Sequence, residues 1–411
     1  MLISLAWKNI WRNKKRSVII LIAIALGLWA GLFASSVMFG AWDSAISSAI
    51  DRELSDIQIH SPQFVKEKLI NNTIPHPDKI INILKNDKEI FSFSERVVIE
   101  GMVSSPTSSV GVEIMGIDPG KEKNVTSVSS KLLEGNYLEK GPPVGRQEIR
   151  NPILVGEELA KKLGLKLKSK MVLSFQTPDG SIAYAAFRIE GIFKTESSTF
   201  DKSTVFVRRD NLYSILGTTP FIHEIAIRLN NPQNLETAMN QIQKELPNLS
   251  VQDWKKIAPE LDVTYELLVI ELYVFLAIIL LALLFGVTNT MLMSVIDRIR
   301  ELGVLLAVGM KRGRIFVMII YETIMLSLCG GILGMIFGSL TILYFSDKGI
   351  NLSAFSAAYS AYGISTELYP ALPISFYPIL TVMIILTAIF AAVYPAVKAI
   401  KLRPAEAIRT Y

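Results

Sequence analysis

Long blocks of apolar residues dominate the pattern of this chain. There are four of them, at residues 17–40, 272–296, 315–345 and 368–397, and the only charged side chain in any of them is Glu322. A helix needs about 20 mostly apolar residues to cross the hydrocarbon core of a bilayer. The pattern therefore predicts four transmembrane helices. The first block is longer than the apolar core of a cleavable signal peptide, so we expect it to remain as an anchor.

Lysine and arginine are distributed unevenly around these blocks. They crowd residues 8–16 before the first block, residues 297–314 between the second and third, and residues 398–409 after the fourth. In the connection between the third and fourth blocks, Lys348 is the only lysine or arginine. Short loops rich in lysine and arginine stay in the cytoplasm. We therefore expect a multi-pass protein of the inner (cytoplasmic) membrane, with both termini inside and residues 41–266 outside.

The section outside the membrane has the pattern of a mixed α/β domain. Residues 56–60 and 94–103 alternate as strands do, and they flank a helical pattern at 78–90. The order strand, helix, strand returns at 223–229, 235–246 and 249–254. We interpret this as a duplicated β-α-β module that is interrupted by a strand-rich insertion at about 104–215.

Composition narrows the possible functions. A formal charge of +5 and a pI near 9.0 suit a membrane protein with basic inner flanks, and no separate basic patch indicates a nucleic-acid partner. The single cysteine, Cys329, lies inside the third block, so the outside domain has no disulfide. A section of about 220 residues is long enough to form its own core.

No motif of an enzyme is present. The chain has no G-x-x-x-x-G-K-[ST], no H-E-x-x-H and no cysteine pair. The histidines His60, His76 and His223 lack metal-ligand spacing, and we interpret His60 and His223 as ordinary strand-end residues. We therefore predict no catalytic residue, no metal site and no cofactor on this chain.

Small residues recur every four positions in two of the predicted spans. They are Gly27, Gly31 and Ser35 in the first span and Gly330, Gly334 and Gly338 in the third. Such rows let another helix approach closely. The row in the first span suits packing within the chain and contact with a second subunit equally well, whereas we expect the row in the third span to pack within the chain.

Two polar side chains inside the spans are further candidates. Glu322 lies about two helical turns into the third span, and an intramembrane carboxylate is a functional candidate by default. We favour a structural polar anchor for Glu322 over a proton carrier. Asn289, with its neighbour Thr288 in the second span, is expected to form hydrogen bonds between helices.

Residues 297–314, DRIRELGVLLAVGMKRGR, are the most informative cytoplasmic segment. Charged residues crowd its front, and an apolar run fills its centre, which is unusual for a short connector. We predict that this segment receives force from a soluble partner and that Leu302, Leu305 and Leu306 form an apolar knob. The proposed contact set is Arg300, Glu301, Leu302, Gly303, Val304, Leu305, Leu306 and Gly309.

This segment and its surroundings resemble the FtsX-like permease domain of ABC transporters of the MacB and lipoprotein-releasing (Lol) type. The family pattern R-E-I-G-[IV]-L-[KR]-A-[IL]-G is matched at residues 300–309, and Glu322 and the glycine row follow in order. A second signature, P-A-x-x-A-x-x-x-x-P-x-E-A-[IL]-R, is matched from Pro395 to Arg409. Leu306 departs from the pattern, because the family often has lysine or arginine there.

The resemblance implies how such a protein is powered. Related permeases form homo- or heterodimers clasped from the cytoplasm by two copies of a separate ATPase, which binds ATP and Mg. The ATPase would dock on residues 297–312, and this chain would hydrolyse nothing. The outside domain would consist of a porter module with an inserted Sabre module.

The expected fold is an α-helical membrane protein with four transmembrane helices and a large α/β extracytoplasmic domain between the first two. Its expected parts are an interfacial helix (1–16), the first span (17–40), the outside domain (41–266, with porter halves at about 45–103 and 216–258 and a Sabre-like insertion at about 104–215), the second span (267–296), the coupling segment (297–314), the third span (315–345), an outside loop (346–371), the fourth span (372–397) and a cytoplasmic tail (398–411).

Three functions are compatible with this organisation. Release of lipoproteins from the inner membrane is favoured, because MacB carries its ATPase on the same chain and division-type FtsX proteins usually have a smaller outside domain. The alternatives are MacB-like export of peptides or drugs by mechanotransmission, and FtsX-like signalling to a cell-wall hydrolase. The implied partners are an ABC ATPase, a second permease subunit and membrane lipids, together with lipoprotein cargo and a periplasmic carrier or adaptor.

Overall fold

The computed structural model describes residues 2–12, 14–106, 108–138 and 151–401. These residues form two compact units. The first unit is built from Met1–Ala41, Tyr265–Asn351 and Glu367–Tyr411, and the second from Trp42–Thr264 and Leu352–Thr366.

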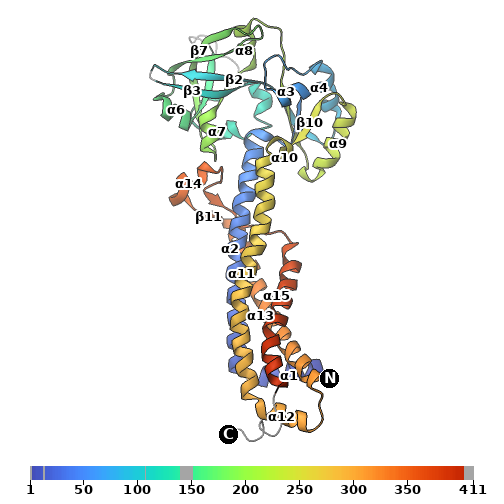
Figure 1. Ribbon diagram of the computed structural model, residues 1–411. Coiled ribbons are helices and arrows are strands. Elements are labelled where there is room, and N and C mark those ends of the chain that lie inside the picture. The colour runs from blue at the N-terminus through green and yellow to red at the C-terminus, as the bar shows by residue number, and fades with distance from the viewer. Residues whose placement is uncertain (1, 13, 107, 139–150, 402–411) are drawn as a thin grey trace. The chain divides into compact units, whose positions relative to one another are not determined.

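Four long helices form the first unit, and each is long and apolar enough to cross a membrane (Figure 1). They are α2 (Lys14–Ala49), α11 (Pro259–Asp297), α13 (Arg312–Lys348) and α15 (Phe376–Ile400). Large apolar side chains such as Leu281, Phe285 and Phe390 remain exposed on them, as expected for surfaces that face lipid. The predicted fold of four apolar spans with an α/β domain between the first two is confirmed.

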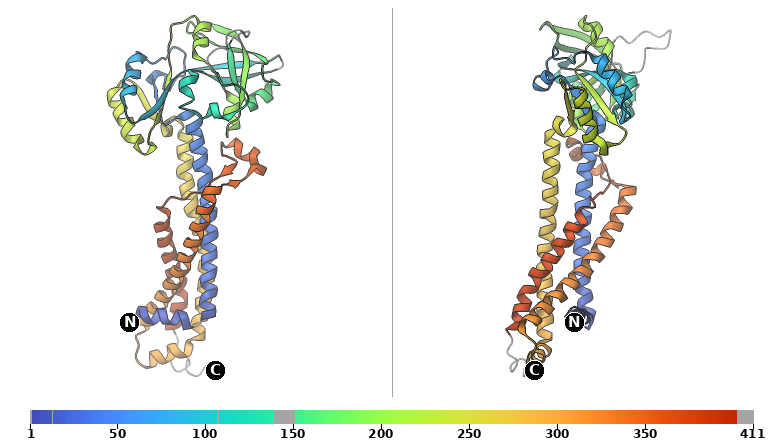
Figure 2. Two further views of the ribbon diagram at one scale, coloured as in Figure 1. Left: turned by 180° about the vertical axis from the view of Figure 1, so that it is seen from behind. Right: turned by 90° about the vertical axis from the view of Figure 1, so that its right-hand side faces the viewer.

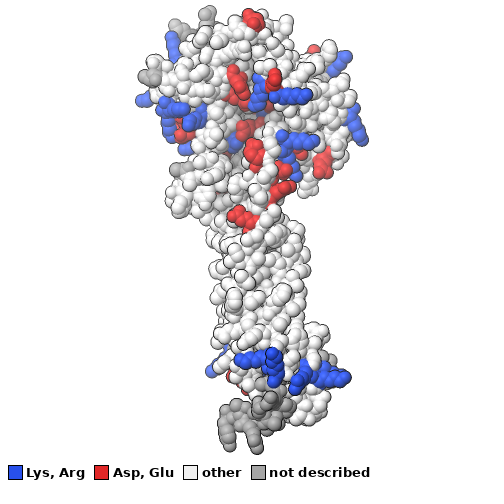
Figure 3. Space-filling view, in the orientation of Figure 1, with Lys and Arg blue, Asp and Glu red and all other residues white. Residues whose placement is uncertain are grey.

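Charged side chains are sparse along the middle of the long helices of this unit. Figure 3 shows no charged residue along the middle of the long helices on the visible face, whereas lysines and arginines gather at the end that carries α1 (Leu2–Arg12). In α1, Trp7 and Trp11 pack edge to face with ring centroids 5.9 Å apart, and both remain partly exposed. Exposed indoles beside basic residues are typical of a helix at the membrane interface.

Short elements connect the long helices. Helix α12 (Ile299–Ala307) lies between α11 and α13. Between α13 and α15, the strands β11 (Ile350–Asn351) and β12 (Glu367–Leu368) pair antiparallel. The residues enclosed by this pair include the turn η4 (Ser353–Phe355) and helix α14 (Ser356–Ala361), which belong to the second unit and pack on its helix α7 (Ser198–Ser203).

The second unit contains two subdomains, of which the first is a four-stranded antiparallel sheet. The order of its strands is β10 (Ser250–Asp253), β1 (Ile57–His60), β9 (Glu224–Leu229) and the first half of β2 (Ile90–Ser104). Helices α4 (Pro77–Asn86) and α9 (Leu235–Glu245) bury Ile80, Leu84, Ala238 and Ile242 in its core. The two β-α-β units interleave as in a ferredoxin-like fold, and their strands and helices lie where the sequence indicated them.

The second subdomain is a barrel. The second half of β2 pairs with β3 (Ser109–Ile117), and the sheet continues through β8 (Thr204–Arg208), β5 (Pro152–Gly156), β7 (Ile182–Phe193) and β4 (Leu132–Gly135). Strand β6 (Lys170–Gln176) pairs with both β2 and β7 and so closes the barrel. Its interior is filled by apolar side chains such as Val103, Ile114, Leu173, Phe187 and Val205.

Short helices border the barrel strands. They are α5 (Pro119–Glu122), η2 (Val128–Lys131), α6 (Glu157–Leu163), α7 and α8 (Arg209–Leu216). In the ferredoxin-like subdomain, α3 (Pro62–Lys66) and η3 (Pro232–Asn234) lie in the connections. Figure 2 shows both subdomains from two further sides.

The chain enters and leaves the second unit through helices. Helix α2 continues into a π-helical turn, η1 (Ile50–Leu54), which ends at Ser55 with a φ of 56°. Helix α10 (Trp254–Ile257) leads back into α11. Ala49, Leu54 and Ala258 form a small apolar core at this point.

Candidate coupling site

Helix α12 presents a different face from the one that the sequence indicated. Leu302 and Gly303 are buried and Leu305 and Leu306 are only half-exposed, so they do not form the predicted projecting knob. The i, i+3 and i+4 spacing that made these leucines look like one surface turns that surface toward the protein. The exposed apolar side chains are Val304 and Val308, which are 50% and 83% exposed.

The exposed row of α12 therefore consists of Arg300, Val304 and Val308, which are spaced by one helical turn. Glu301 is also exposed beside this row. Such a row of one charged and two apolar side chains can enter a groove of a soluble partner.

Gly309 ends α12. It has a φ of 96°, and the main-chain nitrogens of Gly309 and Met310 donate to the carbonyl oxygens of Leu306 and Leu305 at 3.1 and 3.0 Å. This left-handed cap is strained for any residue with a side chain. Gly309 therefore fixes the tight connection between α12 and α13.

Glu322 connects α13 to the start of α12. It is 4% exposed, and it accepts a short hydrogen bond from the guanidinium of Arg298, which follows directly after α11. Arg298 also donates to the hydroxyl of Ser294 at 2.7 Å. Arg298 is a functional residue that the sequence motifs did not indicate, although it is the basic residue nearest the inner end of the second span.

A second ion pair joins α12 to the interfacial helix. Arg12 of α1 lies 2.5 Å from the Glu301 carboxylate, and both side chains are about half exposed (48% and 52%). Both ion pairs line a polar pocket of about 240 Å³ between α1, α11, α12 and α13. Helix α1 itself packs on α13 and buries Ala6 and Ile10.

Both rows of small residues face helices of the same chain. A Cβ at Gly27 or Gly31 would lie 3.1 Å from Leu283 or 2.9 Å from Ile279 of α11. In α13, Cβ atoms at Gly330, Gly334 and Gly338 would come within 2.8 to 3.1 Å of α2 atoms. Ser35 is fully buried in α2, and its hydroxyl has no hydrogen-bond partner among the described residues. The row in the first span is therefore filled within the chain.

The polar residues of the second span differ in their surroundings. Thr288 donates to the carbonyl oxygen of Ala391 in α15 at 3.1 Å. Asn289 is exposed on α11, and its side chain forms no hydrogen bond within the part of the chain that the structure describes. In the second signature, Pro395, Ala396 and Ala399 are buried in α15, while the residues from Pro404 to Arg409 lie outside the described residues.

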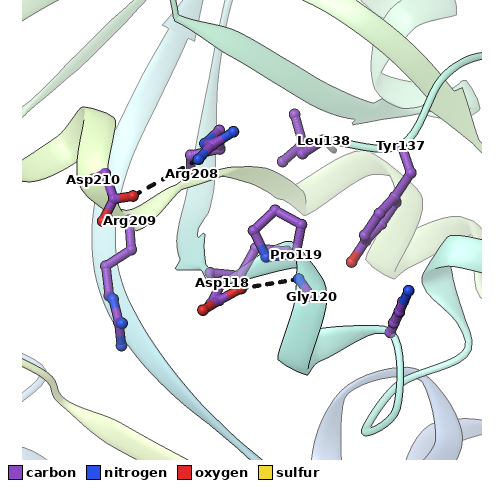
Figure 4. Close-up of a pocket in the computed structure, with 10 residues that line it drawn as sticks. Asp118, Pro119, Gly120, Tyr137, Leu138, Arg208, Arg209 and Asp210 are labelled. Atoms are coloured by element: carbon purple, nitrogen blue, oxygen red, sulfur yellow. Dashed lines mark hydrogen bonds and ion pairs between the residues drawn. The ribbon is translucent and has the colours of Figure 1, made fainter. Parts of the chain in front are cut away.

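The second unit contains a pocket of about 380 Å³ beside α5 and α8 (Figure 4). Among its charged side chains, Arg209 lies 3.1 Å from Glu95 and Arg208 lies 3.7 Å from Asp210. Asp118 accepts from the main-chain nitrogen of Gly120 at 2.9 Å. Burial raises the pKa of the Tyr137 hydroxyl, which therefore stays neutral. No group of three or more metal-ligating side chains occurs among the described residues.

His60 and His223, which we interpreted as ordinary strand-end residues, lie at the end of β1 and directly before β9, and both are buried. The rings of His60 and His223 both stack on the ring of Phe64, with ring centroids 5.7 and 4.8 Å from that of Phe64. His223 accepts from the Val98 main-chain nitrogen and contacts the Ile70 carbonyl oxygen at 2.9 Å. Burial lowers the pKa of His223, so the ring is neutral and structural.

Comparison with known families gives two matches along this chain. Residues 17–245 match the MacB-like periplasmic core domain, and residues 273–404 match the FtsX-like permease C-terminal domain. Because the first match alone covers more than half of the chain, this protein belongs to the FtsX/MacB-like family of ABC transporter permeases. It is the permease component of such a transporter and works with an ATPase partner.

Several named proteins are similar to this chain, some over nearly its whole length and others over part of it. A lipoprotein-releasing system transmembrane protein LolC from Buchnera aphidicola is 27% identical over 97% of this chain and 95% of its own length. A LolC protein from Neisseria meningitidis is 21% identical over 97% and 96%. A macrolide export ATP-binding/permease protein MacB from Chlorobium luteolum is 34% identical, over 30% of this chain and 16% of its own length.

Among solved structures, the periplasmic region of MacB from Actinobacillus actinomycetemcomitans is similar to 52% of this chain and 95% of its own length. The sequence identity is 14% and the TM-score 0.36.

Proposed function

We propose that this permease couples ATP hydrolysis on a separate ATPase to movement of its extracytoplasmic domain, and that the movement releases lipoproteins from the inner membrane. The observation that carries the coupling role is the exposed row of α12. Val304 and Val308 offer apolar surface in a segment that we place in the cytoplasm, where it would otherwise be in water. ATP and Mg would bind to the ATPase.

The surroundings of α12 support transmission of force. A push on the helix reaches α13 through Arg298 and Glu322, and it reaches α1 through Glu301 and Arg12. Because Leu302 and Gly303 are packed against the protein, the helix cannot be displaced without moving its neighbours.

A dimer with a second permease subunit, identical or homologous, follows from the family. The rows of small residues are occupied within the chain, so the second subunit would use other faces. Exposed apolar side chains of α2 and α11, including Ile22, Leu26 and Val274, offer such surfaces. The same walls would contact membrane lipids and the acyl chains of a lipoprotein.

Lipoprotein release is supported by the relatives called LolC, which match this chain over nearly its whole length. A periplasmic carrier would then receive the cargo. MacB-like export is the second candidate, because residues 17–245 match the MacB-like periplasmic core domain.

The test is reconstitution of the full-length permease with its ATPase in liposomes that contain a triacylated lipoprotein. We expect ATP-dependent release of the lipoprotein to a soluble carrier, and we expect Val304→Asp to abolish both the release and the stimulation of the ATPase. Val304→Ile, which keeps the apolar surface, is the matched control. Absence of release in the presence of stimulated ATP hydrolysis would remove the lipoprotein function and favour export with a periplasmic adaptor or signalling to a cell-wall hydrolase.

A further inference from the structure

Arg96 is a fully buried arginine in the middle of the second unit. Its side chain is 1% exposed, and it lies on β2 at the point where this strand passes from one subdomain to the other. Arg96 pairs with Glu224 of β9 in the ferredoxin-like sheet, and the next residue, Val97, pairs with Gly116 of β3 in the barrel.

The guanidinium of Arg96 binds three separate elements. Its Nε and Nη2 donate to the two carboxylate oxygens of Glu122 at 3.2 and 2.7 Å. Its Nη1 donates to the Glu224 carboxylate at 2.6 Å and to the main-chain oxygen of Glu53 at 2.9 Å. Glu122 ends α5 beyond the barrel strand β3, Glu224 begins β9, and Glu53 belongs to the π-helical turn η1.

The carboxylate of Glu224, which binds Arg96, is held in its charged form. Burial by itself raises the pKa of Glu224, but the nearby Arg96 and His60 outweigh burial and hold this pKa at about 2. His60 contacts the second carboxylate oxygen of Glu224 at 3.1 Å. Ionised partners make these hydrogen bonds charge-assisted, which are the strong ones.

Other contacts attach the same turn to both subdomains. From the ferredoxin-like sheet, Arg228 donates to the carboxylate of Asp51 at 2.6 Å. From the barrel side, the main-chain nitrogen of Ser127 donates to the Asp51 carbonyl oxygen at 2.7 Å, and the guanidinium of Arg52 lies 4.9 Å from the centre of the Phe200 ring in α7.

We infer that η1 and Arg96 form the output joint of the permease, through which displacement of α2 moves both extracytoplasmic subdomains together. This inference rests on the proposed function, in which ATP-driven motion reaches the outside domain. Arg96 acts here as a positioning residue. Separating the two subdomains from each other would leave a charge of the Arg96 cluster buried without its partner, which is costly. The same guanidinium holds the turn through the main-chain oxygen of Glu53. π-Helical turns within longer helices occur frequently at functional sites.

The test uses spin labels in the full permease–ATPase complex, with Cys329 replaced by alanine. One label is placed at Ser47, an exposed position on α2, and the other at Lys85 in the ferredoxin-like subdomain or at Lys162 in the barrel. In the wild type we expect both distances to be narrow and equal with and without ATP, because the joint is rigid. In Arg96→Gln we expect both distributions to broaden, and lipoprotein release to fall roughly tenfold while ATP hydrolysis continues.

Two further variants separate the joint from general folding. Lys68→Gln removes an exposed ion pair with Glu113 (2.8 Å) elsewhere in the unit and should change neither distance nor release. Arg96→Lys keeps the charge and should restore part of the release. If Arg96→Gln does not fold, Asp51→Asn combined with Arg228→Gln removes a partly exposed contact to the same turn and should broaden the Ser47–Lys85 distance.

The outcomes distinguish the joint from the proposed function. Narrow distances in Arg96→Gln, or in the double variant if that must be used, would overturn the joint even if release falls. If the extracytoplasmic domains of the two subunits show no ATP-dependent displacement in the wild type, the proposed function fails and the joint with it. Displacement in the wild type that survives unchanged in Arg96→Gln overturns the joint alone.

Discussion

Arginine–glutamate pairs serve the coupling site and the extracytoplasmic joint in opposite ways. Arg12 and Glu301, at α12, are about half exposed, and such pairs are worth at most about 1 kcal/mol. Arg96 and Glu122, at the joint, are 1% and 0% exposed, and the second carboxylate that the guanidinium binds, Glu224, is 8% exposed. The difference indicates that the contacts of α12 at the coupling site can rearrange when a partner docks, whereas the contacts of Arg96 at the joint stay together.

The largest effect should follow from removing the charge at the joint. Arg96→Met leaves Glu122 and Glu224 buried without their partner, so we expect a loss of about 3–5 kcal/mol in the free energy of unfolding of the outside domain. Urea titration of the full-length protein in detergent measures this, monitored by the fluorescence of Trp254 in a background in which the other four tryptophans are replaced by phenylalanine. A loss below about 1 kcal/mol is what an exposed ion pair would give, so it would contradict the difference between the joint and the coupling site.

The half-buried pair at the coupling site should give an intermediate effect. Glu322→Gln leaves the Arg298 guanidinium, 17% exposed, without its carboxylate, and we expect this to cost about 1–3 kcal/mol. Thermal unfolding of the membrane unit measures the loss. The double variant Arg298→Gln, Glu322→Gln should recover part of it, and strictly additive losses would show that the two residues do not interact.

Docking should depend on the exposed row more than on the leucines behind it. Val304→Asp introduces a charge into the contact surface, and we expect ATPase stimulation to fall at least about tenfold, as for a central interface residue. The permease should still fold, because Val304 is 50% exposed. Equal stimulation by the wild type and by Val304→Asp would place the ATPase elsewhere.

Acid should weaken the joint, because Glu224 must be ionised to pair with Arg96. The folded-state pKa of Glu224 is lowered from 4.5 to about 2, so its contribution to stability is present above pH 4.5 and is lost as the pH falls toward 2. The difference in unfolding free energy between the wild type and Glu224→Gln should therefore shrink from pH 5 to pH 3. A difference that stays constant over this range would mean that Glu224 is not held ionised by Arg96.

The smallest effect is expected for the exposed pair itself. Arg12→Gln should change stability by less than about 1 kcal/mol, and the change should diminish as salt is added. Stability measured at low and high ionic strength checks this. A larger effect that does not respond to salt would make Arg12 part of a buried network and would remove the contrast with Arg96.

The sequence predicted the parts of this fold that follow local rules. Uncharged runs identified the four long helices, and alternation with helical spacing identified both β-α-β units. Glycines four positions apart indicated close helix packing, but the spacing did not show that the Gly27 row meets α11 of the same chain. In α12, the apolar spacing was recognised, while the choice between an outward and an inward face depends on packing.

The ionic contacts could not be predicted, because they join residues far apart in the chain. Arg96 lies 26 residues from Glu122 and 128 from Glu224, and within its own segment it looks like a surface residue of an alternating strand. Glu322 was recognised as an unusual carboxylate, but its partner Arg298 belongs to another helix. The limits of the expected parts along the chain and the roles of the coupling residues remain predictions.

The central claim is that α12 receives the ATPase and that the resulting motion reaches the outside domain. The most direct measurement is the distance between spin labels on the extracytoplasmic domains of the two subunits, in the reconstituted complex with and without ATP. We expect ATP to change this distance in the wild type and to leave it unchanged in Val304→Asp. An ATP-dependent change of the same size in Val304→Asp, or no change in the wild type, would contradict the role of α12.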